Sequence, residues 1–213
     1  LIDFNECARH SIINAFNELG FTYTDKVFET FITENVKIWK RLEKGEITKP
    51  QLRADRWNII LKKLGIDFDG TVLEEMFENG VAKGAYAVDG AYELLEYLKD
   101  KYKLYIVSNG FRFVQESRIK IGNFEKYFDD VFVSEDVGIP KPAKEFFDYC
   151  FENINHPPKD DVILIGDSIT ADILGGINYG IDTIWFNKNN EPLPENINPT
   201  YTVNTLNEIK NIL

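Results

Sequence analysis

Three short segments of the chain carry side chains that could hold an anion beside a metal ion. Ser108-Asn109-Gly110 presents a hydroxyl and a following backbone N–H, which suit a phosphate oxygen. Lys141 stands between two prolines, which restrict the backbone around its ammonium group and so provide a fixed cation. Asp167 and Asp172 offer two carboxylates to a hard cation, and Mg²⁺ that retains several waters is the best match.

Each of these segments follows a short apolar run. The runs cover residues 104–107, 131–133 and 162–165. Parallel strands of an open sheet bind ligands beyond their carboxyl ends, so we expect the three segments to meet at one edge of a sheet. Each segment alone could be a helix cap or an ordinary turn. Their shared position after successive strands favours a functional site.

The chain after Gly84 alternates β-branched or aromatic runs with helical patterns. A fourth apolar run covers 183–186, and helical periodicity covers 89–100, 112–122, 143–153, 170–179 and 205–213. Strands separated by helices of this length imply right-handed crossovers and a doubly wound, mostly parallel, Rossmann-like sheet. The stretch 187–198 is rich in Asn and Pro and predicts a surface loop.

The first part of the chain predicts helices without a sheet. Apolar residues recur at helical spacing between about residues 6 and 81, and Gly20, Gly45 and Gly65 separate the repeats. No stretch in this region alternates apolar and polar residues as a strand with one exposed face does. The fold class is therefore α/β, with a doubly wound core and an added helical bundle.

Composition narrows the range of partners. The chain has 213 residues, and 24 Lys and Arg against 35 Asp and Glu give a formal net charge of −11. We expect no nucleic-acid polymer as partner, because binding its backbone needs clustered basic residues, whereas a small phosphorylated metabolite needs only a local basic pocket. Cys7 and Cys150 lie within helical patterns and predict reduced thiols.

The location of the protein follows from what the chain lacks. No apolar run reaches the length of a membrane-spanning helix, and no signal peptide opens the chain. We therefore expect a cytoplasmic protein with no membrane partner. A monomer and a homodimer are equally compatible with the sequence.

The three segments resemble motifs of the haloacid dehalogenase-like (HAD) hydrolases. Ser108-Asn109 is similar to the second motif of that superfamily, and Lys141 in Gly138-x-x-Lys141-Pro142 is similar to the third. Gly166-Asp167-x-x-x-x-Asp172 is similar to the fourth. The resemblance covers essentially the whole chain, and the residues around the motifs resemble the bacterial pyrimidine 5'-nucleotidase branch.

The same resemblance implies two domains and a missing first motif. Residues 4–83 would form a helical cap inserted after the first core strand, and residues 84–213 would form the core. The family's nucleophile is an aspartate, followed two residues later by another, on the loop after a buried strand. Because Leu1-Ile2-Asp3-Phe4 resembles the residues that follow this loop, we expect the strand and the loop upstream, within about a dozen residues. A truncated, inactive product is the alternative.

A stretch inside the helical part matches the missing motif letter for letter. Asp67-Phe68-Asp69-Gly70-Thr71 has the Asp-x-Asp-Gly-Thr pattern, but a helical pattern precedes it where the motif needs a buried apolar strand. A second helical pattern follows, and Thr71-x-x-Glu74 would form a capping box at its start. We therefore predict that residues 67–71 form a turn between two helices.

The family resemblance implies a mechanism and a role for each site residue. Phosphoryl transfer would proceed in two steps through an aspartyl phosphate, with Mg²⁺ offsetting charge. Ser108 and the Asn109 N–H would hold phosphate oxygens, and Lys141 would neutralise charge on the nucleophile and the phosphoryl group. Asp167 would bind Mg²⁺, and Asp172 would orient the metal's waters or Lys141.

The substrate follows from the branch resemblance alone, which implies a nucleoside 5'-monophosphate, above all a pyrimidine one. Sugar phosphates are the nearest alternative. A 2-haloacid dehalogenase would use the same nucleophile without a metal, and the pair of Asp167 and Asp172 argues against it. A catalytically inactive binding module on the same fold is the last alternative, because the chain from Leu1 to Leu213 has no nucleophile that follows a strand.

Overall fold

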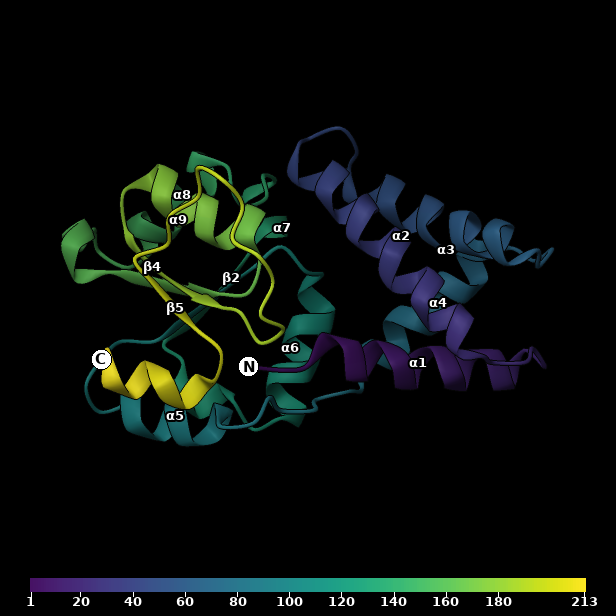
Figure 1. The fold of residues 1–213 in the computed structure, drawn as a ribbon, viewed down its shortest axis with the longest axis horizontal. Coiled ribbons are helices and arrows are strands. Elements are labelled where there is room, and N and C mark those ends of the chain that lie inside the picture. The colour runs from purple at the N-terminus through teal and green to yellow at the C-terminus, as the bar shows by residue number, and fades with distance from the viewer. The chain divides into compact units, whose positions relative to one another are not determined.

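The computed structural model describes every residue from 1 to 213, and the chain divides into two compact units (Figure 1). The first unit comprises Leu1–Ala87 and Arg112–Phe124 and is helical. The second unit comprises Val88–Phe111 and Glu125–Leu213 and contains all the strands. None of the helices has the length and apolar character that crossing a bilayer requires.

Five helices build the first unit. They are α1 (Phe4–Glu18), α2 (Asp25–Glu43), α3 (Lys49–Leu64), α4 (Gly70–Ala82) and α6 (Arg112–Ile121). Helix α4 packs against α1, α3 and α6. The sequence grouped residues 112–122 with the α/β core, whereas α6 belongs to the helical unit. The division of the chain into a cap domain at 4–83 and a core domain at 84–213 stays a prediction, because compactness alone does not identify a cap.

Aromatic rings fill the centre of the helical unit. Phe16, Phe31, Trp57 and Phe77 are almost fully buried, and each comes from a different helix among α1 to α4. The ring centroid of Phe31 lies 5.0 Å from that of Phe77 and 5.5 Å from that of Trp57. Because four helices each contribute one ring, the cluster stabilises their mutual packing. The helical periodicity of the sequence predicted these buried faces.

Side-chain caps mark where α3 and α4 begin. Thr48 and Gln51 form a capping box at the start of α3. Asp69 caps α4, because its carboxylate accepts a hydrogen bond from the backbone N–H of Thr71 at 2.9 Å. The expected capping box from Thr71 to Glu74 is wrong. Glu74 instead points into the unit, where it pairs with a buried arginine.

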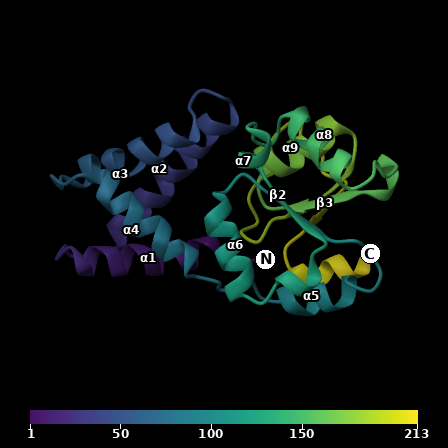
Figure 2. The same cartoon turned by 180° about the vertical axis from the view of Figure 1, so that it is seen from behind.

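The second unit alternates strands with helices. Its longer elements are α5 (Ala91–Leu98), β1 (Tyr105–Ser108), β2 (Asp130–Val133), α7 (Ser134–Val137), α8 (Lys144–Asn153), β3 (Ile163–Gly166), α9 (Leu174–Tyr179), β4 (Asp182–Phe186) and β5 (Tyr201–Val203). Short 3₁₀ turns occur at Glu125–Tyr127, Lys159–Asp161 and Leu206–Asn211, and a π-helical turn at Ile169–Ile173 precedes α9. Figures 1 and 2 show α8 and α9 on one side of the strands and α5 with the C-terminal turn on the other.

The strands are parallel, as predicted, but they form two separate sheets. β1 pairs with β2, and β3 pairs with β4, which pairs with β5. Neither β1 nor β3 has a second partner strand, so each presents one unpaired edge. The sequence analysis did not predict β5, because its three residues follow the Asn- and Pro-rich stretch and are too few to show a period.

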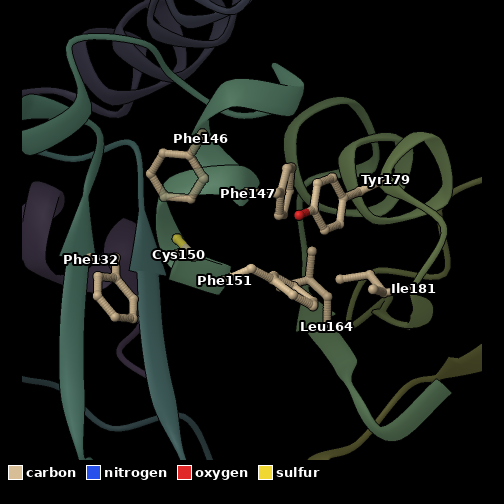
Figure 3. Packing of buried hydrophobic residues seen from close by; sticks show 8 residues of the cluster. All are labelled: Phe132, Phe146, Phe147, Cys150, Phe151, Leu164, Tyr179 and Ile181. Carbon is tan, nitrogen blue, oxygen red and sulfur yellow. The ribbon is translucent and has the colours of Figure 1, made fainter. Parts of the chain in front are cut away.

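Helix α8 covers the strands with an aromatic face (Figure 3). The buried cluster combines side chains of α8 with others from β2, β3, α9 and the link between α9 and β4: Phe132, Phe146, Phe147, Cys150, Phe151, Leu164, Tyr179 and Ile181. The Phe147 ring stacks on that of Tyr179 with centroids 5.3 Å apart. Cys150 and Cys7 are both free, and both are buried; burial raises the pKa of the Cys150 thiol to about 12.

The helical unit contains a buried network of charged side chains. Arg56 donates from Nε to Glu74 at 2.9 Å, from one terminal nitrogen to Asn35 at 3.2 Å and from the other to Glu74 and Glu78. Arg53 pairs with Glu78 at 2.8 Å. Burial raises the pKa of Glu74 to about 7, although the nearby Arg56 acts to lower it. Desolvation therefore raises the pKa of Glu74 by more than the attraction to Arg56 lowers it.

We expect Glu74→Gln to change how stability depends on pH. A pKa raised from 4.5 to about 7 on folding means that the folded wild type binds the proton more tightly, so its stability falls as pH rises between these values. The glutamine cannot ionise, so the stability of the variant relative to wild type should rise by up to about 3 kcal/mol between pH 4.5 and 8. Urea unfolding at several pH values measures this difference.

Glu75→Gln provides the matched control, because Glu75 is the exposed neighbour on the same helix. This control should follow the wild type at every pH. If the stability difference between Glu74→Gln and wild type is the same at pH 4.5 and pH 8, Arg56 keeps Glu74 ionised throughout and our reading of the network is wrong.

Candidate functional site

The predicted site residues lie beyond the carboxyl ends of β1 and β3. Ser108 is the last residue of β1, and Asn109 follows it directly. Gly166 is the last residue of β3, and Asp167 follows it. Lys141 comes from the loop between α7 and α8. The sheet of β1 and β2 therefore positions Ser108 and Asn109, and the sheet of β3 to β5 positions Asp167.

Lys141 is the buried cation of the site. Only 5% of its surface is exposed, and its Nζ donates to the backbone oxygen of Val107 at 2.8 Å and to Oδ1 of Asp172 at 2.7 Å. An ammonium group has three N–H donors, so one remains for a ligand. The contact with Val107 fixes the ammonium next to the end of β1, one residue before Ser108.

Asp172 holds Lys141 from the side of β3. Its Oδ1 accepts from Lys141, and its Oδ2 accepts from the backbone N–H of Ser168 at 3.1 Å. Asp172 lies in the π-helical turn, and only 7% of its surface is exposed. A Cβ on Gly166 would lie 2.3 Å from Asp172 Oδ2, so this approach requires glycine at the end of β3. With both oxygens engaged, Asp172 orients Lys141.

Asp167 has a different environment from Asp172. Its backbone oxygen accepts a hydrogen bond from Trp185 Nε1 at 3.2 Å, while its side chain keeps contact with solvent and pairs with no Lys or Arg. Protein atoms nevertheless surround it closely, and this desolvation, with the charge of Asp172, raises the pKa of its carboxyl. A carboxylate that forms no ion pair with Lys or Arg can ligate a divalent cation.

The donor set fits magnesium better than a metal held by protein ligands alone. Nowhere in the chain do three or more His, Cys, Asp or Glu side chains converge as metal ligands. Mg²⁺ commonly binds through one or two carboxylates, with water and substrate phosphate completing its shell. Asp167 matches that role, whereas the engaged oxygens of Asp172 place it behind Lys141.

Ser108 and Asn109 lie where β1 ends. The hydroxyl of Ser108 accepts from the backbone N–H of Gly110 at 3.0 Å, which leaves its own O–H free to donate. The side chain of Asn109 bonds to the backbone of Lys141 through both its oxygen and its nitrogen, each at 2.8 Å. Sequence reasoning assigned Asn109 through its backbone N–H and did not foresee this contact. A sequence pattern gives no measure of distance across such loops.

The structure thus brings most predicted site residues into one connected set. Hydrogen bonds link Asn109 to Lys141 and Lys141 to Asp172, and Ser108 is adjacent to Asn109 along the chain. Asp167 joins this set through charge, since Asp172 and Lys141 both shift its pKa. No hydrogen bond connects Asp167 directly to the others.

The Asp-x-Asp-Gly-Thr stretch at residues 67–71 belongs to the helical unit and not to the α/β unit. These residues form the turn between α3 and α4 in the helical unit, as predicted. The carboxylate of Asp69 bonds to both the N–H and the hydroxyl of Thr71, which lowers the pKa of Asp69. Its partners are those of a helix cap, and no strand precedes it.

Known hydrolases are similar to this chain along nearly all of its length. The family model described as haloacid dehalogenase-like hydrolase matches residues 4–180. The HAD-hydrolase YfnB of Bacillus subtilis is 34% identical over 213 residues, which cover 100% of this chain and 91% of that protein. Its crystal structure, bound to magnesium, matches with a TM-score of 0.94 and covers 100% of this chain and 93% of the other.

Two pyrimidine 5'-nucleotidases are similar as well. YjjG of Escherichia coli is 34% identical over 198 residues, which cover 93% of this chain and 87% of that protein. PynA of Streptococcus pneumoniae is 31% identical over 219 residues, which cover 100% of this chain and 92% of that protein. Both similarities span the helical and the α/β parts of the chain.

Gly166→Ala should destabilise the protein through Asp172. The new Cβ would meet the Asp172 carboxylate within 2.5 Å, and we expect a loss of about 1–3 kcal/mol in the free energy of unfolding. Asp172→Gly removes the collision, because the Cβ of Asp172 as well as its carboxylate lies within 2.5 Å of the new Cβ. The double variant should therefore be more stable than the sum of the two single effects predicts, as urea unfolding can measure. Additive effects would show that the two residues do not collide.

Proposed function

The chain belongs to the haloacid dehalogenase-like hydrolases, and from this premise we propose that it is a magnesium-dependent phosphatase of nucleoside 5'-monophosphates, with pyrimidine nucleotides preferred. Phosphatases of this family act on small phosphorylated metabolites. The names of YjjG and PynA support the nucleotide, and the magnesium in the YfnB structure supports the metal. One observation carries the proposal: a buried ammonium with a spare donor bonds to the residue before Ser108, whose hydroxyl is free to donate.

The phosphoryl group would be held by three donors of the α/β unit. The Ser108 hydroxyl and the Asn109 backbone N–H bind two of its oxygens, and the third N–H of the Lys141 ammonium binds another. Because Lys141 is buried, its charge acts in a medium of low dielectric, where it stabilises the phosphoryl dianion strongly. Asp172 keeps the ammonium in place during turnover.

Asp167 would hold Mg²⁺ together with water and a phosphate oxygen. Bound there, the metal supplies charge neutralisation on the transferring group. The protein contributes the orientation: the hydrogen bond from Trp185 Nε1 to the backbone oxygen of Asp167 fixes the residue at the end of β3.

The nucleophile would be an aspartate on a strand between β1 and β3. Its carboxylate would attack phosphorus, and the P–O bond to the nucleoside would break as the leaving oxygen takes up a proton. Water would then attack the aspartyl phosphate, which would release inorganic phosphate and regenerate the carboxylate. Asp67 and Asp69 lie in a helix-to-helix turn and do not supply it. We propose that this strand and its loop precede residue 1 in the chain. The single partner of β1 and of β3 supports a strand in that place.

Lys141→Ala should abolish phosphate release. We expect kcat/KM for pyrimidine nucleoside 5'-monophosphates and for p-nitrophenyl phosphate to fall by about 10³-fold, because a preorganised charge at the transferring group is lost. The assay uses the full-length protein, with sugar phosphates and 2-haloacids as competing substrates. Lys144→Ala serves as control, since Lys144 is an exposed lysine three residues along.

Far-UV circular dichroism distinguishes loss of function from loss of fold in these variants. Retained activity in a folded Lys141→Ala protein contradicts the proposed site. Faster turnover of a sugar phosphate or a 2-haloacid than of any nucleotide contradicts the proposed substrate and leaves the site intact.

Removal of magnesium should stop the reaction. We expect a chelator to abolish phosphate release and added Mg²⁺ to restore it. Asp167→Asn should raise the Mg²⁺ concentration for half-maximal activity by about tenfold or more, because the neutral amide is a weaker ligand. Asp161→Asn, at an exposed aspartate before β3, should leave it unchanged. Full activity in the chelator would show that the Asp167 site does not serve a metal.

A further inference from the structure

We infer that the Asn109 carboxamide is a positioning residue that fixes the backbone of Lys141 and thereby places its ammonium group. Asn109 Oδ1 accepts from the Lys141 N–H at 2.8 Å, and Asn109 Nδ2 donates to the Lys141 carbonyl oxygen at 2.8 Å. One side chain thus satisfies both backbone polar groups of one residue. This role is distinct from the phosphate contact proposed for the backbone N–H of Asn109, although its catalytic meaning rests on the proposed function.

Lys141 needs such a partner because of its neighbours. Pro140 and Pro142 have no N–H, so Lys141 carries the only backbone donor between Ile139 and Ala143. This segment belongs to no helix or strand that could pair its backbone groups. An unpaired buried amide is costly, and the Asn109 side chain removes that cost.

The chemistry of the contact selects asparagine. A carboxamide presents an acceptor and a donor side by side, so it can pair with an N–H and a carbonyl oxygen of the same residue. Aspartate offers acceptors only, and alanine offers neither. Asn109 is itself anchored: it follows β1 directly, and its backbone oxygen lies 3.4 Å from the Ser134 hydroxyl, which donates to it.

Lys141 is consequently held at both ends of a flexible side chain. Val107 and Asp172 hold Nζ, and Asn109 holds the backbone. A lysine side chain otherwise samples many rotamers, and two fixed ends remove most of them. The turn after β1 therefore positions the Lys141 ammonium, because Asn109 holds the Lys141 backbone and directly follows Ser108.

Hydrogen exchange tests the contact without reference to activity. Lys141 has the only exchangeable backbone amide in residues 140–142, so peptides across this segment report on it. In the full-length protein we expect Asn109→Ala to speed exchange of this amide by about tenfold, the effect of losing one hydrogen bond. Asn109→Asp keeps an acceptor and should stay close to wild type. Asn153→Ala, at an exposed asparagine on α8, should change nothing here.

A double-mutant cycle tests the consequence for the anion. Binding of inorganic phosphate with Mg²⁺ is measured by calorimetry for wild type, Asn109→Ala, Lys141→Ala and the double variant. Asn109→Ala keeps the backbone N–H, so we expect it to weaken binding only through Lys141, by about tenfold. The double variant should then bind no more weakly than Lys141→Ala alone.

The possible outcomes separate this inference from the proposed function. Unchanged exchange at Lys141 in a folded Asn109→Ala protein overturns the positioning role, whatever the activity. Additive losses in the cycle overturn it as well, because Asn109 would then act independently of Lys141. If wild type binds no phosphate, the proposed function fails, and the exchange measurement still decides whether Asn109 positions Lys141.

Discussion

The buried ion pair between Lys141 and Asp172 constrains the rest of the α/β unit. Removing an ammonium and a carboxylate from water costs several kcal/mol for each ion, and their attraction offsets this only with good geometry and further hydrogen bonds. The structure provides those bonds through the Val107 oxygen for Lys141 and the Ser168 N–H for Asp172. It also provides the space, because Gly166 leaves room for the carboxylate. The ends of β1 and β3 and the π-helical turn are thus arranged around one pair of charges.

The two buried ion networks of the chain differ in what lies next to the cation. In the helical unit every nitrogen of the Arg56 guanidinium has a partner, and these partners are Glu74, Glu78 and Asn35. These contacts use four of the five guanidinium N–H groups, and the network sets how α2, α3 and α4 pack. The ammonium of Lys141 uses two of its three donors. This ammonium bonds to the residue before Ser108, whose O–H is free to donate, and on the proposed function these two donors bind an anion.

The sequence predicted the features that depend on local order. Apolar runs marked four of the five strands, and the residues directly after them marked Ser108 and Asp167, because a strand end and the next residue are neighbours along the chain. It did not predict features that depend on the distance between segments. The contact between Asn109 and Lys141 joins residues 32 positions apart. The lack of space for a side chain at Gly166 and the division of the strands into two sheets also produce no periodic pattern in the sequence.

The turn at residues 67–71 shows why a pattern of letters needs its backbone context. Asp69 caps α4 through Thr71, so the second aspartate and the threonine of the pattern are explained by a helix start. The glycine is explained by packing: a Cβ on Gly70 would lie 2.4 Å from the backbone nitrogen of Asn58, and the Gly70 N–H donates to the Asn58 side chain at 3.0 Å. Each of these letters thus has a local structural cause. A nucleophile would also need a strand behind it that directs the carboxylate to a sheet edge, and α3 takes that place here.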